Sequence, residues 1–384
     1  MATIAENIQT LRSIKSDIKN AIIQKGGSVT DAFGTYAQAI TNLPSGGGGG
    51  TENEDALVMR ELRVYSNDRV SKVGSYAFTN NWMLSSINLP NCTNINNYAF
   101  AFCNSLSSIS FPNASIVDGY TFYKCRALPS IDLPLCTRLG FYAFESCTSL
   151  SSVNLPLCSN VSSSAFQGCS ALTTVNLPLC TNVEWCVFRS CYSLSSIDLP
   201  SCTRLGYSVF ESCSALTTVS LPNCSYIGNA AFKNCTNLQS INLPKVTTLS
   251  GYAFSGCSKL TSVSLPNCIS ILDYAFYRCS ALPSIDLPLC TILDGYGVFR
   301  ECSALLSINI PNCISIGYYV FYKCANLTQV YINSVSSVTR IYSDTFENCP
   351  NLTSVYVPAS LVDAFKTAQY WSSLSSKIVA YTGA

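Results

Sequence analysis

The sequence predicts an α/β-type solenoid in which each coil of 22 residues contributes one short parallel strand. Three observations predict it. A phenylalanine returns every 22 residues from Phe78 to Phe276 and the pattern continues to Phe346; apolar residues between these positions fall into fixed columns; and a proline follows each candidate strand. A fixed period of 20 to 50 residues is typical of stacked repeats, which bury their apolar faces only against neighbouring repeats. We therefore expect chain length to reflect the number of repeats.

The strand of each coil is predicted from the recurring pattern Leu-x-x-Ile-x-Leu-Pro. In the first full unit, Ile87 and Leu89 alternate with polar residues, which is the period of a strand with one buried face. Pro90 cannot donate to a sheet ladder, so the strand ends there. Ile109 and Phe111 occupy the same positions one period later. The pattern thus predicts apolar columns that run through all coils.

The cysteines follow the same period. Of the 22, twelve lie three residues after a repeat phenylalanine and nine lie two residues after a strand proline, which leaves only Cys186 outside a column. Neighbouring members of a column have parallel Cβ vectors, so a disulfide would distort adjacent coils. Ala114 and Val246 replace cysteine in the second column, and the chain has neither histidine nor a CxxC pair, so we expect no metal site. The pattern predicts reduced, buried, structural thiols.

Residues 1–45 do not follow the repeat. Apolar residues spaced alternately by four and three predict two short amphipathic helices, which form either an oligomerisation or docking module or a self-contained helical hairpin. Residues 46–56 begin with five consecutive glycines and are predicted to be a flexible linker.

The repeat region is predicted to span residues 57–357. Tyr65 and Val73 lie one period before Ile87 and Ile95, which indicates a partial first repeat that acts as an N-terminal cap. Residues 358–384 are predicted to form a C-terminal cap, with a helix near its start and a final strand near its end, because a solenoid must cover its last coil.

The repeat unit also resembles a known family. Leu-x-x-Ile-x-Leu-x-x-Cys matches the leucine-rich repeat template. The run SINLPNCTNINNYAFAFC resembles more narrowly the BspA-like class of bacterial leucine-rich repeats, across about residues 57–384 and thirteen phenylalanine positions. The period of 22 is slightly shorter than is usual for that class, and Cys often stands where the class has Val. The resemblance implies an extracellular adhesion or host-interaction protein, with some members encoded by phages and prophages, and it implies no enzymatic activity.

Composition excludes several classes of function. Only 11% of residues are charged and the net charge is +1, whereas nucleic-acid binding normally requires a basic face. No apolar run approaches the length of a membrane span, and the N-terminal residues lack the apolar core of a Sec-type signal peptide. Without histidine a Ser-His triad is impossible, and Asp132, Asp198 and Asp286 occupy a solvated strand column. We therefore expect no catalytic residues and no cofactor.

A comparison of repeats within the chain indicates where binding residues lie. The strand face is uniformly small and polar, as at Ser86, Ser108 and Ser130, whereas the positions flanking each repeat phenylalanine vary and are rich in Tyr, Trp and Arg. These residue types dominate binding hot spots and paratopes. We predict that variation is confined to this one edge of the solenoid and that the ligand-binding residues are Phe102, Tyr123, Phe141, Tyr142, Trp185, Arg189, Tyr207, Tyr277, Arg278, Tyr318 and Tyr322.

These features together favour a non-enzymatic recognition protein. We interpret the chain as a phage or prophage virion appendage that binds a protein or glycan on a cell surface through its variable edge. Residues 1–45 would then provide a homo-oligomer contact or dock the protein onto the virion. The alternatives are a bacterial surface adhesin and a structural spacer without a ligand. The expected location is the virion or the extracellular surface.

Overall fold

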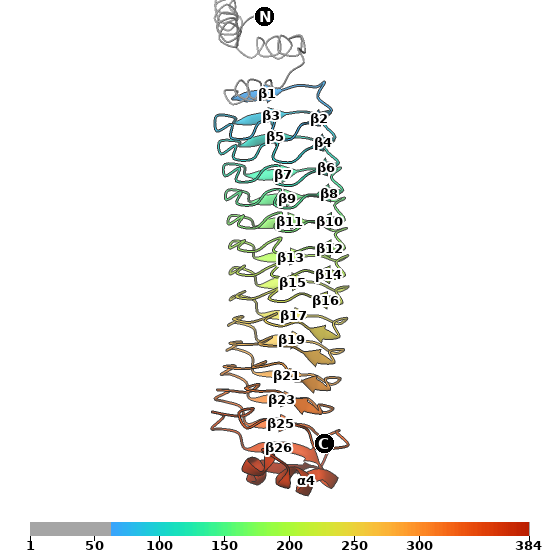
Figure 1. Ribbon diagram of the computed structural model, residues 1–384, viewed down its shortest axis with the longest axis vertical. Helices are drawn as coiled ribbons and strands as arrows, with labels where there is room; N and C mark the ends of the chain where they lie inside the picture. The colour runs from blue at the N-terminus through green and yellow to red at the C-terminus, as the bar shows by residue number, and fades with distance from the viewer. Residues whose placement is uncertain (1–62, 384) are drawn as a thin grey trace, which may run out of the picture.

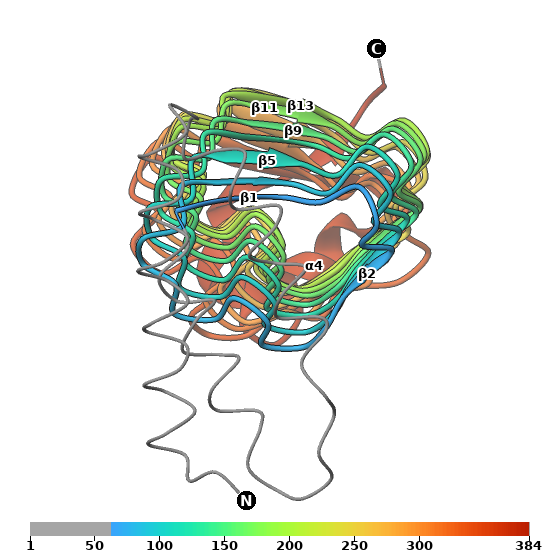
Figure 2. The same ribbon diagram turned by 90° about the horizontal axis from the view of Figure 1, so that it is seen from above.

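The computed structural model describes residues 63–383 as one elongated solenoid of parallel strands, which confirms the predicted fold class (Figure 1). Viewed along its axis, successive coils lie over one another (Figure 2). Helices within the described range occur only at the C-terminal end. The helical module predicted for residues 1–45 and the linker predicted for residues 46–56 lie outside the described residues.

The predicted strand is the first strand of each coil. Ile87 pairs in parallel register with Tyr65 of the preceding coil and with Ile109 of the next, so equivalent residues lie side by side. The strands nearest the C-terminal end belong to one five-stranded group. The first strands of successive coils are β1 (Val64–Ser66), β3 (Ser86–Asn88), β5 (Ser108–Ser110), β7 (Ser130–Asp132), β9 (Ser152–Asn154), β11 (Thr174–Asn176), β13 (Ser196–Asp198), β15 (Thr218–Ser220), β17 (Ser240–Asn242), β19 (Ser262–Ser264), β21 (Ser284–Asp286), β23 (Ser307–Asn309), β25 (Gln329–Tyr331) and β26 (Ser354–Pro358).

Each coil up to β24 also has a second strand, which the sequence analysis did not predict. These strands are only two residues long, so no alternation marks them in the sequence; they exist because the neighbouring coil supplies hydrogen-bond partners. Together they form one continuous twelve-stranded parallel sheet, visible as a second column in Figure 1. Its members are β2 (Lys72–Val73), β4 (Asn94–Ile95), β6 (Ile116–Val117), β8 (Arg138–Leu139), β10 (Asn160–Val161), β12 (Asn182–Val183), β14 (Arg204–Leu205), β16 (Tyr226–Ile227), β18 (Thr248–Leu249), β20 (Ser270–Ile271), β22 (Ile292–Leu293) and β24 (Ser315–Ile316).

The third side of each coil is a run of tight turns, here called the turn ladder. Its backbone pairs with the next coil: the Tyr98 N–H donates to the Gly119 carbonyl (3.1 Å) and the Phe100 N–H to the Thr121 carbonyl (2.8 Å). Nearly every coil has two residues with left-handed φ here, as at Tyr98 (59°) and Phe102 (63°). Such φ values cost a side-chain-bearing residue roughly 1 kcal/mol. Asn and Gly, which adopt this conformation readily, occupy the second of these positions at Asn80, Gly168, Asn234, Gly256 and Asn348.

The core consists of stacked columns. The repeat phenylalanines from Phe78 to Phe346 form a continuous ring stack, with centroids 5.0–5.8 Å apart and planes within 15° of parallel. Cys103 is fully buried beside this stack, and its thiol donates to the Phe78 carbonyl of the preceding coil at 3.0 Å. Burial raises the pKa of this thiol to about 12, so it remains a protonated donor.

The cysteine columns therefore lie where the period predicts. All cysteines in residues 63–383 are free thiols, and every one is buried except Cys186, which is half-buried. Ala114 and Val246, which replace cysteine in the second column, are fully buried as well. The second column makes a different bond from the first, as in Cys92, whose thiol donates to the carbonyl of Asn94 two residues ahead at 3.3 Å.

The C-terminal end is closed by short helices packed beneath the last coil (Figure 1). After β26, the 3-10 turn η1 (Ala359–Leu361) leads into α4 (Val362–Thr367), then η2 (Trp371–Lys377) and β27 (Ile378–Tyr381). The predicted helix is thus divided into a 3-10 turn and a short α-helix. Phe365 and Trp371 are buried against the core, and the Trp371 indole donates to the Thr339 carbonyl at 2.6 Å. β27 pairs in parallel with β26 and extends the sheet.

Candidate functional site

The candidate site lies on the outer surface of the turn ladder. Here the repeat phenylalanine and the small residue before it point inward and are fully buried, as at Ala143 and Phe144. Most of their neighbours in the turn are at least partly exposed, although Ala101, Ser164 and Ser255 are buried. We define the variable edge as the residues two to four positions before each repeat phenylalanine and the two positions after it. The turn ladder holds them at the spacing of the coils.

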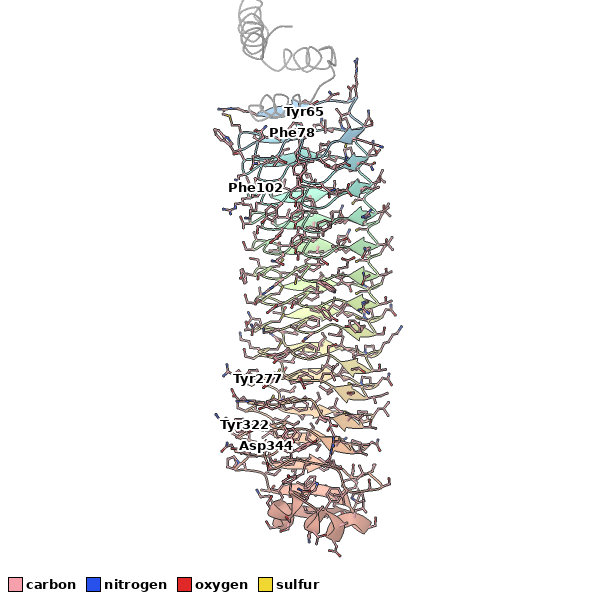
Figure 3. All side chains as sticks on the ribbon, in the orientation of Figure 1. Tyr65, Phe78, Phe102, Tyr277, Tyr322 and Asp344 are labelled. Carbon is pink, nitrogen blue, oxygen red and sulfur yellow. The ribbon has the colours of Figure 1, made fainter. Side chains whose placement is uncertain are left out.

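The predicted binding residues all lie on the variable edge, but their exposure differs. Phe102, Tyr277 and Tyr322 lie along the same side of the solenoid (Figure 3). The half-buried residues are packed against neighbours: Tyr142, for example, stacks on Tyr120 with centroids 4.7 Å apart. The exposed members are Phe141, Trp185, Arg189, Tyr207, Arg278 and Tyr318, and the half-buried members are Phe102, Tyr123, Tyr142, Tyr277 and Tyr322.

A central aromatic cluster occupies the middle of the variable edge. The rings of Trp185 and Tyr207 are stacked with centroids 5.6 Å apart, and the side chains are 57% and 44% exposed. Beside them, the Arg204 guanidinium lies 4.0 Å from the centroid of the Tyr226 ring. Partial burial and the neighbouring Tyr207 hydroxyl raise the pKa of Tyr226 above its ordinary value. The cluster combines large apolar area with hydrogen-bonding groups.

Arg204 and Tyr226 belong to strands β14 and β16, outside the edge that the sequence analysis singled out. The prediction that variation is confined to one edge is therefore wrong. The outward position of the second strand also varies, from Asn94 and Ile116 to Arg138, because it faces solvent and carries no packing constraint. In the sequence, this outward position is the residue directly before the buried residue of each second strand. It can be recognised as a variable surface position only when the second strand is known.

A groove lies at the N-terminal end of the variable edge. It encloses about 400 Å³ and runs along the turn ladder beside strand β8. Tyr76, Tyr98 and Tyr120, which form one stack with centroids 4.5–4.9 Å apart, line one wall. The remaining lining residues are Ser75, Asn97, Asp118, Gly119, Arg138, Gly140, Phe141 and Ser162. Of the lining residues, only Phe141 is among the predicted binding residues.

Cationic side chains pack on aromatic rings toward the C-terminal end of the variable edge. The Arg278 guanidinium lies 4.9 Å from the Tyr277 ring centroid, and that of Arg300 lies 4.8 Å from the Tyr322 ring centroid. Both arginines pair with Glu301, at 2.8 Å and 3.4 Å. Partial burial would raise the pKa of the Glu301 carboxyl, but these two arginines hold it below its usual value. The arginines are thereby fixed in position, which favours specific over diffuse electrostatic contacts.

A smaller cluster of the same kind lies near the N-terminal end. Phe102 and Tyr123 meet edge to face, with ring centroids 5.2 Å apart, and the Lys124 ammonium lies 4.9 Å from the Tyr123 ring centroid.

The polar column of the first strands forms hydrogen bonds between coils. Asp132 accepts a hydrogen bond of 2.7 Å from the Asn154 side chain of the next coil, so it supports stacking of coils.

Two other kinds of feature would bear on function: a metal site and a membrane-spanning helix. Among residues 63–383, no group of three or more His, Cys, Asp or Glu side chains is arranged to hold a metal ion. The helices in the same range are too short or too polar to cross a bilayer.

Comparisons with known proteins agree with this geometry. A family model described as "BspA type Leucine rich repeat region (6 copies)" matches residues 71–183, 137–261 and 247–375. No curated protein matches the chain. Among solved structures, a leucine-rich repeat protein from Bacteroides ovatus is 24% identical over 83% of this chain and 92% of its own, with a TM-score of 0.52. A leucine-rich repeat protein from T. pallidum is 31% identical over 40% of this chain and 78% of its own, with a TM-score of 0.39.

A leucine-rich cell surface protein from Faecalibacterium prausnitzii is 22% identical over 82% of this chain and 91% of its own, with a TM-score of 0.36. The likeness to the Bacteroides ovatus structure concerns the fold alone, whereas the family model covers most of the repeat region. The chain therefore belongs to the BspA-type leucine-rich repeat family.

Proposed function

We propose that this protein is a non-enzymatic recognition protein that binds a cell-surface ligand through the variable edge, as a phage or prophage virion appendage. The observation that carries the proposal is the central aromatic cluster. Trp185 and Tyr207 remain largely exposed although the adjoining apolar columns already fill the core. An exposed pair of this size on a rigid scaffold loses little conformational entropy on binding, which is the property of a hot spot.

The composition of the site supports recognition over catalysis. The exposed groups are phenols, an indole, amides and arginines, and Glu301, the carboxylate that pairs with Arg278 and Arg300, is kept ionised by these two arginines. A catalytic acid or base needs a pKa near the working pH and a shaped pocket around the reacting atom. Family membership agrees with a role in surface binding.

The proposal is tested by binding of the full-length protein to intact bacterial cells. Replacing Trp185 and Tyr207 together by Ala should weaken binding by about 30-fold, roughly 2 kcal/mol, and leave the melting temperature almost unchanged. The matched control replaces Ser130 and Ser152 on the strand face by Ala and should bind as the wild type does.

Three outcomes separate the alternatives. Binding to animal cells but not to bacterial cells would favour a surface adhesin over a virion appendage. Loss of binding in the serine variant and not in the aromatic variant would place the site on the strand face. Absence of binding to either cell type would favour a structural spacer.

A further inference from the structure

We infer that the groove at the N-terminal end of the variable edge binds a neutral oligosaccharide. This inference rests on the proposed function and names the ligand class for one part of the edge. The volume of the groove, about 400 Å³, lies within the range of small-ligand sites. Its lining residues come from five successive coils, a span of about 19 Å at the spacing of adjacent strands, so it accommodates more than one pyranose ring.

The shape of the groove arises from one column of the repeat. The residue three positions before the repeat phenylalanine is small in three successive coils, as Ser75, Asn97 and Gly119, and then becomes Phe141. The small residues leave room along the channel, and the Phe141 ring occupies the space over Gly119. A Cβ on Gly119 would lie 2.9–3.1 Å from three carbons of this ring, so glycine lets the ring lie over the backbone of the preceding coil.

The polar lining suits hydroxyl groups. The Asn97 side-chain oxygen accepts the Gly119 N–H at 2.9 Å, which fixes the amide and presents its NH₂ group as a donor. Asp118 supplies an acceptor, Arg138 of β8 supplies donors, and the tyrosine hydroxyls serve as both. A sugar hydroxyl also donates and accepts, so it can satisfy neighbouring groups of both kinds.

The charge and backbone of the groove disfavour other ligands. The negative charge of Asp118 and the positive charge of Arg138 cancel, so the lining gives no net electrostatic attraction for a nucleic acid or a polyanionic glycan. The backbone N–H groups of Tyr98 and Tyr120 already pair with the next coil at 3.1 Å and 2.9 Å. A peptide therefore finds no free strand edge to extend, which is the usual mode for an extended chain.

The aromatic groups are arranged in two ways. The stacked tyrosines use their faces on one another and present ring edges and hydroxyls to the groove. Phe141 stands perpendicular to them, at 88° to Tyr120, and is 48% exposed. Its ring is therefore available to the C–H groups of a pyranose, which carry the partial positive charge that an aromatic face attracts.

The test measures binding of defined neutral tri- and tetrasaccharides of glucose, galactose and N-acetylglucosamine to the full-length protein. Saturation-transfer NMR screens them and calorimetry determines the affinity, with sialylated and sulfated counterparts included. At least one neutral sugar should bind, and Phe141→Ala and Asp118→Ala should each weaken its binding at least tenfold. Ser130→Ala, an exposed change on the strand face and outside the groove, should leave sugar affinity unchanged.

The inference is overturned if no neutral sugar binds, if only anionic sugars bind, or if both groove variants retain wild-type affinity. Because both substituted side chains are solvent-accessible, an unchanged melting temperature verifies that each variant is folded. Failure of this test with cell binding still dependent on Trp185 and Tyr207 would reject the sugar site and leave the proposed function standing. If the sugar test fails and cell binding does not depend on Trp185 and Tyr207 either, both the sugar site and the proposed function are rejected.

Discussion

The buried thiols predict an unusually steep loss of stability at mildly alkaline pH. Burial raises the pKa of the second-column thiols Cys158 and Cys268 to about 11, and that of several other cysteines to about 12. A thiol in an unfolded chain ionises near pH 8.5. Because the folded-state pKa lies above the unfolded value, this contribution to stability is complete below about pH 8 and is lost as the pH rises toward the folded pKa.

The magnitude follows from the difference in proton binding. At pH 9.0 each thiol that ionises only on unfolding lowers the free energy of unfolding by about 0.8 kcal/mol relative to pH 7.5, and the slope approaches about 1.4 kcal/mol per pH unit. The six thiols with a pKa of about 12 should therefore lower it by about 5 kcal/mol, a large part of the stability of an ordinary domain. These six are Cys103, Cys136, Cys180, Cys213, Cys302 and Cys313.

The assay is urea unfolding at pH 7.5 and pH 9.0 with a phosphine reductant present. The double variant Cys158→Ala and Cys268→Val uses residues that the same column already holds at Ala114 and Val246. Between pH 7.5 and pH 9.0, the free energy of unfolding of this double variant should fall by about 1.6 kcal/mol less than that of the wild type. Ser264→Ala, an exposed change in the coil of Cys268, should show the wild-type loss. Equal stability of the wild type at both pH values, or equal losses in the wild type and the double variant, would refute the reasoning.

Three further predictions concern accessibility, assembly and close packing. A maleimide reagent should label Cys186 in the native protein and the buried column thiols only after denaturation, since Cys186 alone is half-buried; extensive native labelling would contradict buried columns. Light scattering should show a smaller assembly for a chain that starts at Thr51 than for the full chain, and identical masses would reject residues 1–45 as the oligomerisation module. Gly228→Ala should lower stability by about 1–3 kcal/mol, because its Cβ would lie 2.5 Å from the Gly206 backbone, whereas Gly74→Ala at the equivalent position meets nothing within 4 Å and should be neutral in thermal unfolding.

The composition of the site was partly predictable. Exposed aromatics such as Trp185 and Tyr207 could be identified because their positions vary between repeats while the adjoining columns stay apolar. The neighbouring pair Arg204 and Tyr226 could not, since Arg204 packs on a ring of the next coil and both residues lie on two-residue strands, which are too short to give a pattern. The groove was also missed, because only the stacking of coils brings Asp118 and Arg138 to one surface.

The sequence by itself determined the period, the buried columns and the first strand of each coil, because repetition makes every coil an independent observation of the same constraint. Phe100 and Cys103 recur at fixed spacing, and packing is the physical reason for both. The tertiary structure decided the second strand, the left-handed residues of the turn ladder and the groove. Tyr98 adopts a φ of 59° although its intrinsic preference opposes it, because its N–H pairs with Gly119 and its ring stacks on Tyr120 of the next coil. Such conformations are stabilised by neighbouring coils, and so they cannot be inferred from one repeat taken alone.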